Sequence, residues 1–172
     1  LVRELLDVDL YEATTVQELL DATAVWAAAY PDAPWVRGGG WDVSLFNTSL
    51  DKGQLDAILG ERPAALSSAD AHSVWVDSAA LEIVGITADT PDPEGGIIER
   101  DEDGEPTGVL RDTAADLVWD ILPEWDDGQI DQGVADALAE AASYGLTGLL
   151  DANAWDAMLA GYLRAEDQRA RT

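Results

Sequence analysis

His72 is the only histidine among 172 residues, and it stands two positions after Asp70. An imidazole can gain or lose a proton near neutral pH, and the carboxylate adds a second ionisable group. An apolar run over residues 63–68 that favours a strand precedes this pair, and a capped helix is predicted from residue 79. Ionisable side chains at the edge of such elements are typical of clefts and ligand sites. A histidine that only caps or hydrogen-bonds a loop fits the same spacing.

Three glycines, Gly38, Gly39 and Gly40, directly precede Trp41. Their backbone N–H groups could hold an anion, but the sequence matches neither the G-x-G-x-x-G nor the G-x-x-x-x-G-K-[ST] pattern. We therefore predict a turn with positive φ angles at this point. Trp41 is expected at the rim of a cleft, whereas most other tryptophans are assigned to the core.

The composition excludes several classes of protein. The chain has no cysteine, so it contains neither a disulfide nor a thiolate zinc site. One histidine cannot build a catalytic zinc centre without ligands from elsewhere. Nine basic residues stand against thirty-five acidic ones, and the net charge of -26 would repel phosphate backbones and anionic lipids. Neither nucleic acid nor a membrane is an expected partner.

The acidity accompanies a normal core content, because 47% of the residues are hydrophobic and seven are tryptophan. The carboxylates must then lie on the surface, and Lys52 is the only lysine. This is typical of halophilic proteins, although an acidic protein from an ordinary environment has the same composition. No apolar run approaches the roughly 20 residues that cross a membrane, and no signal segment is visible, so a cytoplasmic location is expected.

The patterns predict an α/β protein with a mixed sheet, flanking helices and a β-hairpin. A capping box at Thr15 and Glu18 begins the first helix, and Asp77 or Ser78 caps another that ends at Gly85. Helices are expected over 16–30, 54–59, 79–84, 113–122, 130–144 and 155–169, and strands over 35–37, 63–68, 97–100, 107–110 and 146–150. Residues 101–104 lack the ligand spacing of a calcium loop and are interpreted as a solvated turn.

Five segments in a fixed order resemble one family. They are Trp35-Val-Arg-Gly-Gly-Gly-Trp-Asp42, Asp70-Ala-His-Ser-Val-Trp-Val-Asp-Ser-Ala-Ala-Leu81, Gly85-Ile-Thr-Ala-Asp-Thr-Pro-Asp-Pro93, Gly104-Glu-Pro-Thr-Gly-Val-Leu110 and Gly145-Leu-Thr-Gly-Leu-Leu-Asp-Ala152. Together they are similar to amidohydrolase family 3, a branch of the metal-dependent amidohydrolases that includes N-substituted formamide deformylases and exoenzyme regulators.

The resemblance implies a (β/α)₈ barrel enzyme whose divalent metal, expected to be zinc, is held by an H-x-H motif on the first barrel strand and by later ligands. A whole barrel needs roughly 250 residues, so the chain is expected to be a fragment that holds no metal itself. Residues 1–128 would form the family's insertion domain. Residues 129–172 would form a partial TIM-barrel segment of helix, strand and helix.

The family pattern around the histidine is Asp-Gly-His-Ser-x-x-x-Asn-Ser-Ala. This chain keeps Asp70, His72 and Ser73 but has Ala71 in place of glycine and Asp77 in place of asparagine. The resemblance implies that His72 orients substrate or stabilises an oxyanion and that Asp70 orients His72.

Pocket residues are also implied by the resemblance, namely Trp41, Ser73 and Asp151. The parent enzyme would hydrolyse an amide or related C–N bond of a small molecule with a metal-activated water, and the fragment alone would be inactive. A homodimer is left open. The alternative is a non-catalytic interaction or regulatory module whose motifs are structural.

The charge leads to a first prediction, that stability rises with salt. Self-repulsion among the carboxylates weakens as the Debye length falls from about 10 Å at 0.1 M to about 3 Å at 1 M salt. Thermal unfolding of the chain in 0.1 M and 1 M potassium chloride measures the effect. A melting temperature that stays flat or falls over this range would contradict salt adaptation.

Overall fold

The computed structural model describes residues 7–44, 50–152 and 154–170. The chain divides into two compact units, one of which is Asp7–Pro123 and the other of which contains Glu124–Thr172.

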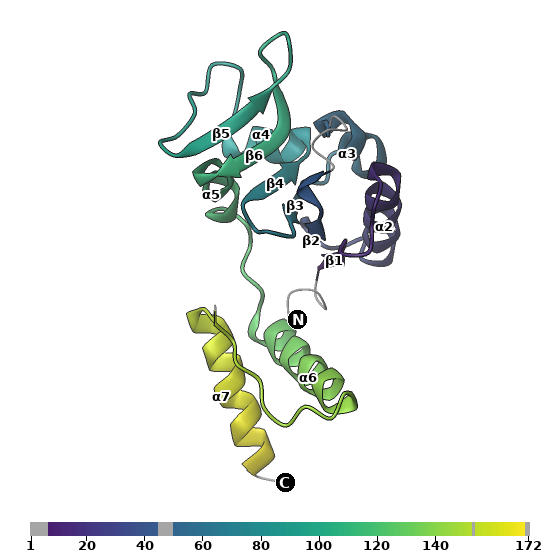
Figure 1. Ribbon diagram of the computed structural model, residues 1–172, viewed down its shortest axis with the longest axis vertical. Helices are drawn as coiled ribbons and strands as arrows, with labels where there is room; N and C mark the ends of the chain where they lie inside the picture. The colour runs from purple at the N-terminus through teal and green to yellow at the C-terminus, as the bar shows by residue number, and fades with distance from the viewer. Residues whose placement is uncertain (1–6, 45–49, 153, 171–172) are drawn as a thin grey trace. The chain divides into compact units, whose positions relative to one another are not determined.

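The unit Asp7–Pro123 is built on a six-stranded sheet in the order β1-β2-β3-β4-β6-β5 (Figure 1). Its strands are β1 (Val8–Asp9), β2 (Val36–Trp41), β3 (Ala64–Ser68), β4 (Ser73–Val76), β5 (Gly96–Arg100) and β6 (Pro106–Asp112). The first three strands are parallel, whereas β4, β6 and β5 add on with antiparallel pairing. The predicted mixed sheet and its β5–β6 hairpin are confirmed.

Helices cover both faces of this sheet. The helices α2 (Val16–Ala29) and α3 (Lys52–Leu59) pack on one face, and α4 (Ser78–Val84) and α5 (Thr113–Trp119) pack on the other. Side chains of β3 alternate between the two cores, because Leu66 lies in the first and Ala65 in the second. This explains why residues 64–66 are apolar without a gap.

Local sequence determines where these helices begin and end. Thr15 and Glu18 form the predicted reciprocal capping box of α2. Asp77 caps α4, and Gly85 ends it with a left-handed φ of 79°. The helix α3 begins at Lys52 and not at the predicted residue 54, because Asp51 caps it.

The glycine segment is a strand and not the predicted turn. Gly38 and Gly39 pair with neighbours on both sides, and only Gly40 has a positive φ, 109°, where the register shifts. A Cβ atom on Gly38 would lie 2.7 Å from the Cβ and 2.8 Å from the carbonyl oxygen of Val8. Glycine is needed here for the close approach of β1, and the paired backbone is not arranged as an anion cradle.

Two strands were missed in the sequence. The strand β1 has only two residues, and β4 lies where a direct step from the histidine into a helix was predicted. Every residue of β4 is buried, so it lacks the alternation of buried and exposed side chains that marks a strand in a sequence. Asp70 and His72 therefore belong to the turn of a β3–β4 hairpin.

In the second unit, α6 (Asp127–Ser143) and α7 (Asp156–Ala170) pack through Ile130, Val134 and Met158. Gly145 has the predicted left-handed conformation, with φ 75°. The strand predicted over residues 146–150 is wrong for the described chain, because Leu150 is 91% exposed and no ladder forms. A strand needs a hydrogen-bonded neighbour, and the described part of this unit offers only helices. Among the described residues, no helix is long and apolar enough to cross a membrane.

The packing of the glycine strand predicts that Gly38→Ala lowers the free energy of unfolding by about 1–3 kcal/mol, the usual cost of an overpacked site. Gly148→Ala is the control, since a Cβ there meets nothing within 4 Å, and its effect should stay within about 0.5 kcal/mol. Urea unfolding of both variants measures the difference. Equal stability of the two variants would refute the packing argument.

Candidate functional site

Asp70 holds the β3–β4 turn together. Its Oδ1 atom accepts hydrogen bonds from the Ser68 hydroxyl at 2.5 Å and from the His72 backbone N–H at 3.1 Å. The hydrogen bond from Ser68 has the largest effect on the pKa of Asp70 and lowers it, and the hydrogen bond from the His72 N–H lowers it further. This carboxylate is therefore charged at neutral pH. Between the two residues, Ala71 takes a left-handed φ of 61°, a conformation that glycine adopts more readily.

The imidazole of His72 is exposed to solvent, and it lies within ion-pair distance of the Asp112 carboxylate. The His72 side chain is 73% exposed, and its Nδ1 atom lies 3.5 Å from Oδ1 of Asp112. The Asp112 backbone N–H also donates to the His72 carbonyl oxygen at 2.7 Å. Asp70 thus contacts the backbone of His72, and the carboxylate beside the ring comes from the end of β6. Asp70 also interacts with His72 through its charge, and its predicted role in orienting the ring stays a prediction.

Asp112 was missed because it is forty residues distant in sequence, and only the pairing of β4 with β6 brings it beside His72. In the sequence, Asp112 is an aspartate at the junction between the predicted strand 107–110 and the helix predicted from residue 113. That position resembles an ordinary N-cap. Asp112 makes no side-chain capping bond and has a φ of 48°, so it does not act as one.

Ser73 and Trp41 are buried. The backbone N–H of Ser73 donates to the Ser68 hydroxyl at 3.0 Å. Ser73 itself is only 4% exposed. The indole of Trp41 is fully buried in the core and donates from Nε1 to the Leu66 carbonyl oxygen at 2.7 Å. Only the Trp41 backbone reaches the turn, where its carbonyl oxygen accepts from Ala69 N–H at 2.8 Å. The prediction of Trp41 at an open rim is therefore wrong.

Asp151 belongs to the other unit and lies on its surface. One of its carboxylate oxygens accepts a hydrogen bond of 2.6 Å from the Tyr162 hydroxyl. Burial, together with this bond, raises the pKa of Tyr162 to about 12. The contact links α7 to the segment after α6, which is a structural role within this unit.

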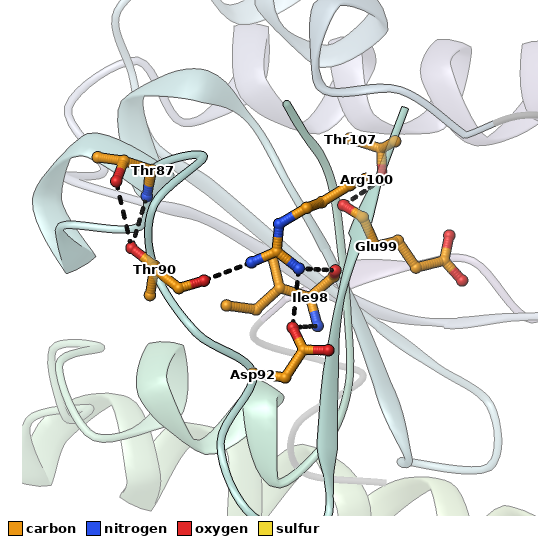
Figure 2. A network of polar contacts seen from close by, with 7 residues as sticks. All are labelled: Thr87, Thr90, Asp92, Ile98, Glu99, Arg100 and Thr107. Atoms are coloured by element: carbon orange, nitrogen blue, oxygen red, sulfur yellow. Dashed lines mark hydrogen bonds and ion pairs between the residues drawn. The ribbon is translucent and has the colours of Figure 1, made fainter. Parts of the chain in front are cut away.

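The segment that follows α4 is held by Arg100, as Figure 2 shows. Its Nη1 atom donates to Asp92 Oδ1 and to the Ile98 carbonyl oxygen, both at 2.8 Å, and Nη2 donates to the Thr90 carbonyl oxygen. Two hydrogen bonds lower the pKa of Asp92, and the one from Arg100 has a larger effect than the one from the Ile98 N–H. These contacts hold the loop that contains Thr90 and Asp92 against β5 (Figure 2). The motif over residues 85–93 therefore has a structural explanation.

Asp77 is a second unusual carboxylate. It is fully buried, and its Oδ1 atom accepts from the N–H groups of Ala80 at 2.8 Å and Ala64 at 3.1 Å. Among the described residues, Oδ2 has no hydrogen-bond partner. Burial raises the pKa of Asp77 to about 6, and the nearby charge of Asp56 acts in the same direction. This aspartate therefore joins β3 to α4 at an electrostatic cost.

Within the ranges described, no three His, Cys, Asp or Glu side chains converge in a way that could hold a metal ion. His72 brings one imidazole and one nearby carboxylate, which is short of the three or four ligands of a protein zinc centre. These residues do not fit a resident metal.

The fold and the ordered motifs identify the class of protein. A sequence profile of the amidohydrolase family matches residues 2–171, and the chain belongs to that family. It is 37% identical over 145 residues to the protein named "Putative amidohydrolase YtcJ" of Bacillus subtilis (strain 168), which covers 83% of this chain and 27% of that protein. It is 34% identical over 144 residues to an N-substituted formamide deformylase of Arthrobacter pascens, covering 80% of this chain and 27% of the relative.

A solved structure agrees with the fold. The crystal structure of an uncharacterized metal-dependent hydrolase from Pyrococcus horikoshii OT3 matches 98% of this chain with a TM-score of 0.66 and 18% identity. The match covers 32% of that chain. This chain therefore spans about a third or less of the length of the proteins it resembles.

The buried Asp77 leads to a prediction about pH. Its pKa of about 6 in the folded protein lies above the ordinary value of 3.8, so its protonation favours folding. The stability it contributes is present below pH 3.8 and is lost as the pH rises through about 6. Asp77→Asn keeps the oxygen that accepts from Ala80 and removes the charge. We expect it to raise the free energy of unfolding by about 1–2 kcal/mol at pH 7.5 and by nearly nothing at pH 4.

Urea unfolding of the wild type and Asp77→Asn at both pH values measures this difference. Asp77→Ala serves as the control, since it removes the cap as well as the charge and should lower stability by about 1 kcal/mol at pH 4. An Asn variant that is less stable at pH 7.5, or a difference that does not change with pH, would contradict the argument.

Proposed function

We propose that this chain is part of a metal-dependent amidohydrolase that hydrolyses an amide or related C–N bond of a small molecule. The unit Asp7–Pro123 would be an insertion domain that helps to form or cap the substrate pocket. The proposal is supported by the family of the chain and by the name of its relative, the N-substituted formamide deformylase. The observation that carries it is the exposed imidazole of the single histidine beside a carboxylate.

The position of His72 suits amide hydrolysis. Attack on an amide gives a tetrahedral intermediate with a negative oxygen, and a correctly placed N–H donor stabilises that oxygen. The leaving amine needs a proton, which an imidazolium can supply. Because Nδ1 of His72 faces Asp112, Nε2 is the nitrogen available to a substrate. In the proposed function, His72 therefore binds the carbonyl oxygen or transfers the proton.

The metal of the whole enzyme, which we propose to be zinc, would take its ligands from residues other than those described. Such an ion supplies an activated water and polarises the carbonyl group. The part of this chain in the reaction is then to orient substrate and exclude water. Accordingly, the chain by itself is proposed to be inactive.

The test is His72→Ala in the full-length enzyme, assayed on N-substituted formamides as the first substrate class. If His72 acts on the substrate, kcat/KM falls roughly ten- to ten-thousand-fold, the range for losing an acid, a base or an oxyanion donor. Because the side chain is 73% exposed, the melting temperature should change little. Glu102→Ala, in the exposed β5–β6 turn, is the surface control and should keep normal turnover.

Normal turnover per folded molecule in His72→Ala would reject the catalytic role. Loss of folding with normal specific activity would show that the histidine only stabilises its loop. Either result would favour the alternative, a non-catalytic interaction or regulatory module.

A further inference from the structure

The site holds two residues of positive φ, one of which forms a backbone hydrogen bond to the neighbour of the other. Ala71, with φ 61°, and Asp112, with φ 48°, are the non-glycine residues of positive φ in the described ranges. The bond from Asp112 N–H to the His72 carbonyl oxygen, 2.7 Å long, joins their two strand ends. Residues in sparsely populated backbone conformations carry a cost of about 1–3 kcal/mol each and cluster at functional sites.

The strain at Asp112 coincides with an unusual use of its side chain. An aspartate in the N-cap position usually accepts a hydrogen bond from the helix, which stabilises a protein by about 1 kcal/mol. Asp112 occupies that position before α5 without making such a bond, and its Oδ1 lies 3.5 Å from Nδ1 of His72. The carboxylate thus faces an exposed imidazole instead of the helix it precedes.

Two acidic side chains interact with His72 in the described part of the chain, Asp112 at 3.5 Å and Asp70 through its charge. Ser73 pairs with Arg111, the residue before Asp112 on β6. Arg111 forms an ion pair with Glu99 on β5. Asp70 is engaged by the Ser68 hydroxyl and the backbone of His72. The charged groups around the imidazole are therefore Asp70 on the turn and Asp112 on β6.

We infer that Asp112 is the positioning residue of His72. Its carboxylate, 3.5 Å from Nδ1, favours the proton on Nδ1 of the neutral ring and so selects the tautomer that leaves the Nε2 lone pair for a ligand. A neutral Nε2 accepts a hydrogen bond from an amide N–H or a water, and a protonated Nε2 donates to a carbonyl oxygen. The inference rests on the proposed function for the role of the site, whereas the pairing itself is a property of this chain.

The single histidine makes the pairing measurable without turnover. Long-range ¹H–¹⁵N spectra of the ¹⁵N-labelled chain give the tautomer of one imidazole with no overlap from others. The wild type should be mainly the Nδ1–H tautomer at high pH, and Asp112→Ala, which removes the acceptor oxygens, should shift it toward the Nε2–H form that free histidine favours. Asp70→Asn is the control, because the amide oxygen can still accept from Ser68 and the backbone, and it should leave the tautomer unchanged. A wild-type ring in the Nε2–H form, or a response to Asp70→Asn and not to Asp112→Ala, overturns the inference.

Kinetics of the full-length enzyme separate this inference from the proposed function. Asp112→Asn should lower kcat by roughly tenfold or more with little change in KM, and Asp112→Glu should restore part of it. Adding Asp112→Asn to His72→Ala should cost nothing further, since the two residues act as a unit. If His72→Ala leaves turnover intact, the proposed function fails even when the tautomer shift is found. If His72→Ala lowers turnover and the tautomer does not respond to Asp112→Ala, the positioning role fails alone.

Discussion

The antiparallel pairing of β4 with β3 on one side and β6 on the other determines where the candidate site residues of this unit lie. Pairing with β3 folds residues 69–72 into a tight turn, which the Ser68 hydroxyl closes by bonding to Asp70 and to Ser73. Pairing with β6 places Asp112 opposite His72. Because β4 is buried on both faces, a slip of its register would expose apolar side chains. The core therefore fixes the geometry of an exposed pair of side chains.

Local chemistry made much of the fold predictable, because caps and turns depend on residues only a few positions apart. Thr15 with Glu18, Asp77, Gly85 and the turn over 101–104 were all identified from such patterns. The errors share another cause. The glycine strand, β4 and the burial of Trp41 depend on neighbours distant in sequence, and a pattern of one segment does not contain them. For the same reason the site was half predicted, with His72 found and Asp112 missed.

Both departures from the family pattern lie at positions of backbone or electrostatic constraint. Ala71 keeps the left-handed conformation that glycine would adopt without strain, so the turn persists at a local cost. Asp77 keeps the oxygen that accepts from Ala80 and Ala64, but its second oxygen is buried without a partner among the described residues. In each case the substitution preserves the contact that shapes the fold and changes the energy of maintaining it.

The few cations of this acidic chain have structural roles. Every basic side chain that the structure describes bonds to a main-chain carbonyl oxygen or to a carboxylate, namely Arg37, Lys52, Arg62, Arg100, Arg111 and Arg164. Lys52, for example, donates from α3 to the Pro106 carbonyl oxygen at the start of β6, and Arg62 donates to the Ala27 carbonyl oxygen near the end of α2. The Lys52 and Arg62 contacts are partly buried, so salt screens them less than it screens repulsion among the exposed carboxylates. A surface can then become strongly acidic without loss of the charged contacts on which the fold depends.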